Sequence, residues 1–209
     1  MVQTSGGGNV SVPLRTMIFI DAGYFTKYWV QKICNIPRDQ YNYRQFSIKL
    51  ATNSYSTLSN SRLIRTYYYD GQYPDTNQSQ FQEQKKFHDW LDRAMGNFEV
   101  KCGQLVKQND GDWEQKGVDT IMAIDMISKA YRDQYDVAIL VSGDADHIPA
   151  VKEVKNSGKQ VYGVYFDSDK ISQSYSKDLI TTLDLGYVLG DKHDGIDNKI
   201  GKGTTQVQN

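Results

Sequence analysis

Acidic residues follow two apolar segments of the sequence at the points where those segments end. The run at residues 17–21 (MIFID) ends at Asp21, and the run at residues 136–142 (DVAILVS) is followed by Asp144 and Asp146. Short apolar runs of this kind are typical of buried parallel strands, and ligands of an open parallel sheet bind outside the carboxyl ends of its strands. We therefore expect these three carboxylates to lie at one edge of a sheet.

A fourth acid, Asp119, opens a helical segment at residues 117–131. At 100° per residue its side chain falls within the apolar arc of that helix, beside Met122 and Met126. We expect this carboxylate to face the edge of the sheet instead of water, and to converge with the other three acids.

Several carboxylates that converge without basic partners repel one another, and a hard divalent cation relieves that repulsion. The sequence thus predicts an Mg²⁺ or Mn²⁺ site formed by Asp21, Asp119, Asp144 and Asp146. An ion of this kind can stabilise the attacking and leaving oxygens of a phosphodiester displacement. Phosphodiester hydrolysis is the leading chemistry.

Each of these acids also has a purely structural interpretation. Asp21 is a favoured N-cap residue, and Asp119 suits the positive end of a helix dipole. Of the acids in the Ser-Gly-Asp turn, Asp146 is the more typical helix cap, which leaves Asp144 as the firmest metal-ligand candidate.

Other polar residues near the acids are expected to bind substrate or to support the site. Lys116 suits a phosphate contact, and the hydroxyl of Ser142 suits orientation of a carboxylate or water. Tyr24 is a further substrate-contact candidate, whereas His147 is more typical of a packing or capping residue. Three further acids are weaker candidates for the site: Asp70, Asp125 and Asp167. Asp125 is expected at the solvated edge of its helix.

Strand and helix patterns alternate through most of the chain, beginning at Met17. This alternation predicts an α/β fold with a parallel central sheet flanked by helices on both faces. We expect a flexible leader at residues 1–15, one domain at residues 16–190 and a disordered tail at residues 191–209. Residues 112–115 are expected to fold back as a short hairpin arm.

Composition limits the classes of partner and location. The formal net charge is −1, so any nucleic-acid contact must be local. Cys34 and Cys102 show no metal-ligand spacing and are expected to be reduced thiols. With neither a signal peptide nor an apolar run long enough to span a bilayer, a cytoplasmic protein without membrane contact is expected. The sequence leaves open whether the chain forms a homo-oligomer.

Three segments resemble the NYN domain family of the PIN-like nuclease superfamily: FIDAGYF at residues 19–25, QKGVDTIMAIDMI at residues 115–127, and VAILVSGDADHIPAVKEVKNSGKQV at residues 137–161. The resemblance implies one PIN-like domain and a divalent-metal ribonuclease site made by the four acids. RNA is therefore the expected partner, with single-stranded RNA favoured. Two positions depart from the family pattern: Tyr24 stands where Asn is frequent, and His147 stands where an aromatic residue such as Phe is frequent.

Two other function classes remain open. A metal-dependent transferase would use the Asp-x-Asp motif at residues 144–146 to hold Mn²⁺ on a nucleotide diphosphate, but that motif is weak. A non-catalytic RNA-binding or assembly module would keep the sheet and leave the site idle. The presence of all four acids favours the nuclease over this second class.

Overall fold

The computed structural model describes residues 12–52, 60–166, 177–189 and 200–201. Its strands are β1 (Leu14–Asp21), β2 (Ser61–Gln72), β3 (Phe98–Lys107), β4 (Trp113–Lys116), β5 (Val137–Val141), β6 (Gln160–Phe166), β7 (Leu185–Leu189) and β8 (Ile200–Gly201). They form one sheet in the order β4-β3-β2-β1-β5-β6-β7-β8. The six inner strands are parallel, and the short edge strands β4 and β8 pair antiparallel to their neighbours.

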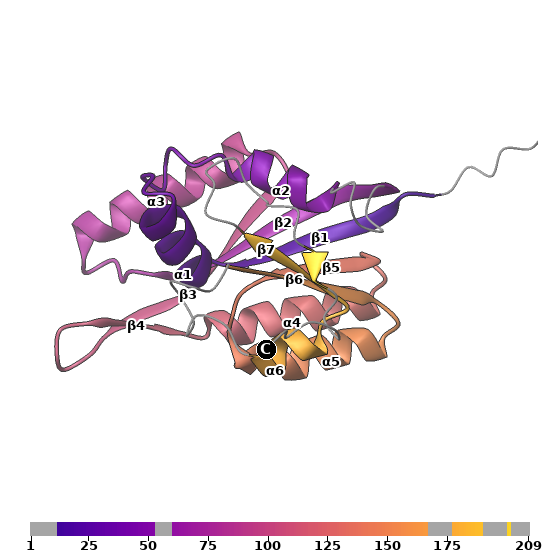
Figure 1. The fold of residues 1–209 in the computed structure, drawn as a ribbon. Coiled ribbons are helices and arrows are strands. Elements are labelled where there is room, and N and C mark those ends of the chain that lie inside the picture. Colours follow the sequence, from indigo (N-terminus) through magenta and orange to yellow (C-terminus); the bar gives the residue numbers. More distant parts are fainter. Residues whose placement is uncertain (1–11, 53–59, 167–176, 190–199, 202–209) are drawn as a thin grey trace, which may run out of the picture.

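Helices cover both faces of the sheet (Figure 1). They are α1 (Ala22–Tyr24), η1 (Phe25–Ile33), α2 (Tyr43–Ala51), α3 (Gln78–Ala94), α4 (Val118–Tyr131), η3 (Ala145–His147), α5 (Ile148–Asn156) and α6 (Lys177–Thr182). One layer contains α1, η1, α2 and α3, and the other contains α4, α5 and α6. The predicted α/β architecture with helices on both faces is confirmed.

Alternation along β1 divides the core between these two layers. Ile18 and Ile20 point into the cluster formed with η1, α2 and α3, whereas Met17 and Phe19 point into the cluster formed with α4, α5 and α6. All four side chains are at most 4% exposed, because a central parallel strand is covered on both faces.

The strand order reverses at β1, which places a topological switch point beside its carboxyl end. The chain adds β2 and β3 on one side of β1, and β5, β6 and β7 on the other. Parallel pairing aligns Ile20 of β1 with Val141 of β5, so the residues that follow these two strands emerge side by side. Ligand crevices of open α/β sheets form at such a point.

Several boundaries differ from the sequence-based expectation. β1 begins at Leu14 rather than Met17, because Arg15 at its start pairs with Asp136 before β5. The helix expected after Asp21 continues as a π-helix, with the Cys34 N–H donating to the Trp29 carbonyl over 2.9 Å.

Towards the carboxyl end, β7 was not assigned from sequence, and β8 lies within the tail that was expected to be disordered. The remainder of that tail and residues 1–11 of the expected leader lie outside the described residues. Among the described helices, none has the length and apolar character needed to cross a bilayer.

Candidate metal centre

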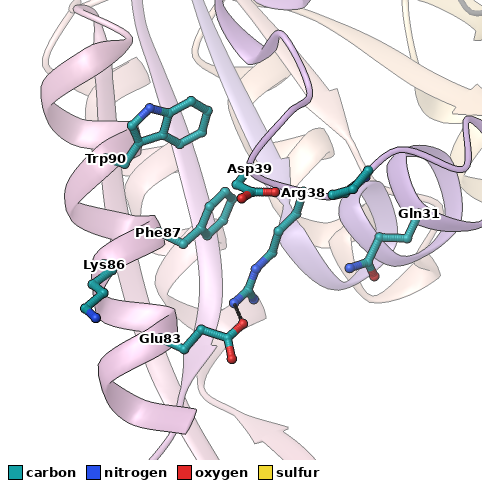
Figure 2. Close-up of a pocket in the computed structure, with 8 residues that line it drawn as sticks. Gln31, Arg38, Asp39, Glu83, Lys86, Phe87 and Trp90 are labelled. Atoms are coloured by element: carbon teal, nitrogen blue, oxygen red, sulfur yellow. Dashed lines mark hydrogen bonds and ion pairs between the residues drawn. The ribbon is translucent and has the colours of Figure 1, made fainter. Parts of the chain in front are cut away.

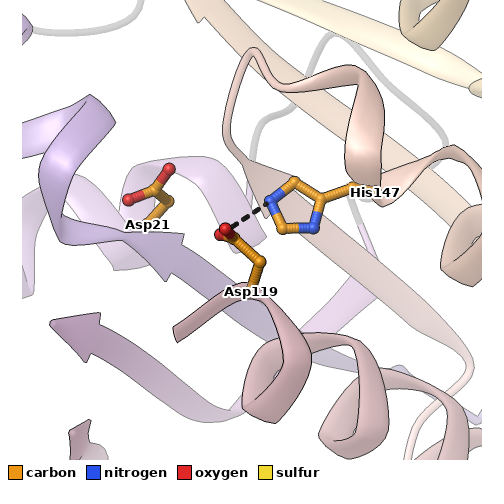
Figure 3. Close-up of side chains that lie close together, drawn as sticks. All are labelled: Asp21, Asp119 and His147. Atoms are coloured by element: carbon orange, nitrogen blue, oxygen red, sulfur yellow. Dashed lines mark ion pairs between the residues drawn. The ribbon is translucent and has the colours of Figure 1, made fainter. Parts of the chain in front are cut away.

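Three side chains with metal-ligating atoms meet at the switch point (Figure 3). Asp21 ends β1, Asp119 lies in the first turn of α4, and His147 ends the η3 turn after β5. One carboxylate oxygen from each acid and one ring nitrogen of the histidine all lie within 4.8 Å of one another. The predicted approach of Asp119 to Asp21 is therefore present, but the third member of the group is a histidine.

The carboxylate of Asp21 is held by both of its oxygens. Its Oδ1 accepts a hydrogen bond from the Tyr24 backbone N–H at 3.2 Å, which caps α1, and its Oδ2 accepts from the Ser142 hydroxyl at 3.4 Å. Ser142 is 4% exposed and lies directly after β5, so this contact links the ends of the two neighbouring strands. The carboxylate-orienting role expected of Ser142 agrees with this contact.

Burial raises the pKa of Asp21 to about 6, and repulsion from Asp119 contributes to this rise. The hydrogen bond from the Tyr24 N–H lowers the pKa but does not cancel these effects. Within the described residues, neither Asp21 nor Asp119 pairs with a lysine or arginine. A cation bound between these two acids would favour their charged forms and so counteract both the burial and the repulsion.

The side chain of Asp119 is 55% exposed, contrary to the expectation that it would be shielded from water. The apolar arc itself is correct, because Met122 and Met126 are fully buried. The difference arises because the first turn of α4 lies at the carboxyl edge, where the sheet no longer covers the helix. Asp119 therefore faces both the candidate centre and solvent.

His147 is fully buried, yet neither ring nitrogen has a hydrogen-bond partner among the described residues. A buried polar atom without a partner costs about 1–3 kcal/mol. Burial also lowers the pKa of His147, an effect that Asp119, Asp144 and Asp146 only partly offset. The centre thus contains a neutral imidazole without hydrogen bonds beside two carboxylates, a donor set that fits a divalent transition-metal ion.

The two acids of the Ser-Gly-Asp turn occupy different positions from those expected. Asp144, not Asp146, is the N-cap of η3. Its Oδ1 accepts a hydrogen bond from the Asp146 backbone N–H at 2.9 Å. Both residues are exposed, and neither belongs to the three-residue group. Their metal-binding role remains a prediction. The sequence analysis assigned His147 to packing or capping, although it follows Asp146 directly and stands where the family frequently has an aromatic residue.

The two other substrate-binding candidates lack the expected environment. Lys116 forms an ion pair with Glu114, on the same face of β4, instead of balancing the charge of Asp119. Tyr24 is 7% exposed, so its ring offers little surface to a substrate. The contribution of Tyr24 to the centre is its backbone N–H on Asp21.

Asp70 forms a separate polar cluster on the α3 side of the sheet. Its Oδ2 accepts from Gln84 at 3.1 Å and contacts His88 Nε2 at 3.0 Å, and its Oδ1 accepts from Gln115 at 3.2 Å. The Gly71 N–H donates to the same Oδ1 at 2.8 Å. These contacts join β2, α3 and β4 and engage both carboxylate oxygens of Asp70.

The other two weaker candidates have different outcomes. Asp125 is buried and forms ion pairs with Lys101 at 2.6 Å and Lys129 at 2.8 Å, so the expectation of a solvated helix edge is wrong. Asp167 lies outside the described residues. Cys34 and Cys102 are free, as expected.

A hollow of about 600 Å³ lies between the end of η1 and α3, and neither Asp21 nor Asp119 lines it (Figure 2). Arg38 crosses it, stacks over the Phe87 ring at 4.8 Å and pairs with Glu83 at 2.9 Å. Because these contacts already occupy the guanidinium group of Arg38, the hollow presents no free cation of its own from that residue.

Comparisons with known proteins agree with the architecture. A crystal structure of a protein of unknown function from Vibrio parahaemolyticus superposes with a TM-score of 0.59 at 19% identity, covering 93% of this chain and 100% of that one. This likeness shows the shared fold alone. No curated protein sequence matches the chain significantly.

The NYN domain family matches residues 15–184, which include all of β1 but its first residue, β2 to β6, and all three residues of the candidate centre. This range also contains all four acids that the sequence singled out. The chain therefore belongs to the NYN domain family of the PIN-like nuclease superfamily.

Proposed function

We propose that this protein is a metal-dependent ribonuclease that hydrolyses phosphodiester bonds of single-stranded RNA. The observation that carries the proposal is the group formed by Asp21, Asp119 and His147 at the topological switch point of a nuclease-family fold. Mg²⁺ or Mn²⁺ is the proposed cofactor, held by Asp21 and Asp119, with Asp144 and Asp146 at its exposed side.

The bound ion would supply charge stabilisation for a phosphodiester oxygen and lower the pKa of a bound water. The chain's own residues have distinct tasks beside it. Ser142 and the Tyr24 N–H fix the orientation of Asp21, so this carboxylate has little freedom to turn away from the centre. The exposed side of Asp119 leaves the centre open to a substrate phosphate arriving from solvent.

The preference for a single strand is argued from charge and access. With a net charge of −1, the chain as a whole does not attract a polyanion, so its contact with a nucleic-acid backbone must be local. A flexible single strand can approach the exposed acids with one phosphate at a time. The RNA preference itself comes from the family resemblance.

Substitution of Asp119 provides the test, because the residue is exposed and its loss leaves the core unchanged. Labelled single-stranded RNA, duplex RNA and single-stranded DNA are incubated with Mn²⁺, Mg²⁺ or EDTA. We expect the wild type to cut single-stranded RNA only with an added ion, and Asp119→Asn to cut it at least about 100-fold more slowly because a ligating charge is lost.

Asp89→Asn is the matched control, since Asp89 is a surface acid on α3 whose contacts are ion pairs with Lys85 and Arg93. It should cut at the wild-type rate. Cleavage by Asp119→Asn at that same rate would refute the proposed site. RNA binding without cleavage under any ion would support the non-catalytic module instead.

A further inference from the structure

His147 differs from an ordinary core histidine in having no polar partner for its ring. It is 0% exposed, and both Nδ1 and Nε2 lack hydrogen bonds among the described residues. Buried polar groups are normally paired, so two unpaired nitrogens on one ring call for an explanation. One of these nitrogens points towards Asp119 (Figure 3).

The distance between His147 and Asp119 is too long for a hydrogen bond and fits ligation of one shared ion. Nε2 of His147 lies 3.8 Å from Oδ1 of Asp119, well beyond a hydrogen bond. Two donors that each lie about 2.1 Å from one ion are separated by roughly 3–4 Å, depending on the angle between them. Asp21, at the end of β1, completes the group, in which one ligand atom from each residue lies within 4.8 Å of the other two.

The backbone that carries His147 is also fixed. Asp144 caps η3 through the Asp146 N–H, and the Asp144 N–H contacts the Ser142 hydroxyl at 3.3 Å. The same hydroxyl donates to Asp21. Ser142 therefore positions both the Asp21 carboxylate and the turn that carries the His147 imidazole. The imidazole is therefore presented to the acids by a connected set of contacts.

We infer that His147 donates an imidazole nitrogen to the ion between Asp21 and Asp119, and that the centre consequently selects Mn²⁺ or a later first-row ion over Mg²⁺. The inference rests on the proposed function for the presence of an ion, and it deepens that function by naming the ion class. Carboxylates alone suit Mg²⁺, whereas imidazole nitrogen favours transition metals, whose affinities rise from Mn²⁺ through Co²⁺.

The test measures binding and spectroscopy separately from cleavage. Calorimetry gives the affinities of the full chain for Mn²⁺, Co²⁺ and Mg²⁺, and electron spin echo of bound Mn²⁺ detects coupling to ¹⁴N. We expect ¹⁴N coupling in the wild type and its change after labelling with ¹⁵N-histidine. This second measurement requires no variant and remains valid if a substituted chain fails to fold.

His147→Phe, which restores the residue type frequent in the family, should lose the ¹⁴N coupling and bind Mn²⁺ at least about tenfold more weakly. Its Mg²⁺ affinity should change less than about threefold, because Mg²⁺ prefers oxygen ligands and depends little on the imidazole nitrogen. His88→Phe is the control, because His88 contacts Asp70 in the separate cluster.

Each outcome separates this inference from the proposed function. Coupling to ¹⁴N without RNA cleavage would support the inference and refute the nuclease. RNA cleavage with bound Mn²⁺ that shows no ¹⁴N coupling would overturn the inference and leave the nuclease standing. Absence of Mn²⁺ binding, or equal Mn²⁺ affinities in the wild type and His147→Phe, would also overturn it.

Discussion

Asp125 is a buried carboxylate whose charge is shared by two lysines from different elements. Lys101 of β3 lies 2.6 Å away, Lys129 of α4 lies 2.8 Å away, and the Tyr69 hydroxyl donates at 2.9 Å. Burial alone would raise the pKa of Asp125, but the hydrogen bonds from both lysines hold it below its ordinary value. Both ammonium groups also lie over the ring of Tyr67.

Replacing Asp125 with Ala would leave two partly buried ammonium groups beside each other. Removal of one partner from a buried ion pair costs about 3–5 kcal/mol, so we expect Asp125→Ala to lose several kcal/mol of unfolding free energy. Urea denaturation followed by circular dichroism measures this change. Asp89→Ala, which breaks only surface pairs, should lose less than about 1 kcal/mol. Equal losses in the two variants would contradict this assignment.

Residue environments were the part of the molecule least open to prediction. The sequence identified Asp21 and Asp119, because strand ends and helix starts can be read from local apolar patterns. Helical periodicity could not show that Lys101 would cover Asp125 from a neighbouring strand. It also could not show that the η3 turn would direct His147 towards the acids, since the direction of that ring depends on a three-residue turn.

At the scale of elements, the junction between β4 and α4 determines where Asp119 lies. Gly103 of β3 faces this junction, and a Cβ at that position would lie 2.5 Å from the Lys116 carbonyl oxygen and 2.9 Å from the Val118 nitrogen. Both are backbone atoms, which cannot move away by a side-chain rotation. The missing side chain of Gly103 therefore allows the start of α4 to approach the sheet.

Gly103→Ala should displace the first turn of α4 and with it the carboxylate of Asp119. We expect at least about a tenfold loss of ion-dependent RNA cleavage, because misplacement of a reacting group by about 1 Å can cost on the order of 100-fold. Gly71→Ala is the comparison, since its new Cβ would meet side-chain atoms of Gln115 and Leu105, which can move. A larger loss in Gly71→Ala than in Gly103→Ala would count against this account.

The elements were predicted well where local pattern decides them. Alternating apolar runs gave the parallel strands, and the turn before Trp113 gave the arm that becomes β4. β7 could not be assigned because its pairing with β6 follows a segment of weak pattern. β8 has only two residues, and its pairing with β7 is set by the assembled sheet rather than by propensity.

Across the whole molecule, a second group of charges lies at the opposite edge of the sheet, where β1 and β5 begin. The Arg15 guanidinium pairs with Asp136 at 2.8 Å and with Asp133 at 2.9 Å, and Lys159 lies 3.7 Å from Asp136. Hydrogen bonds from Arg15 lower the pKa of Asp136 to about 2. This edge therefore depends on ionised carboxylates.

Acid should weaken this edge over a defined range. The folded pKa of Asp136 lies below its unfolded value of about 3.9, so its stabilisation is full above pH 5 and is lost as pH falls through about 2. Asp136→Asn cannot titrate. The unfolding free-energy difference between wild type and variant should be constant from pH 7 to 5 and shrink towards pH 2, as measured by urea denaturation. A difference that stays constant to pH 2 would exclude Asp136 as the titrating group.

The parallel pairing of β1 with β5 has a consequence during protein synthesis. The candidate centre draws one residue from position 21 and another from position 147, and the two meet only after β5 has joined β1. A chain still attached to the ribosome cannot assemble the centre before the turn after β5 has emerged, since contacts so distant in sequence form late. Until that turn has emerged, the proposed nuclease would have Asp21 without His147 beside it and would not cut RNA.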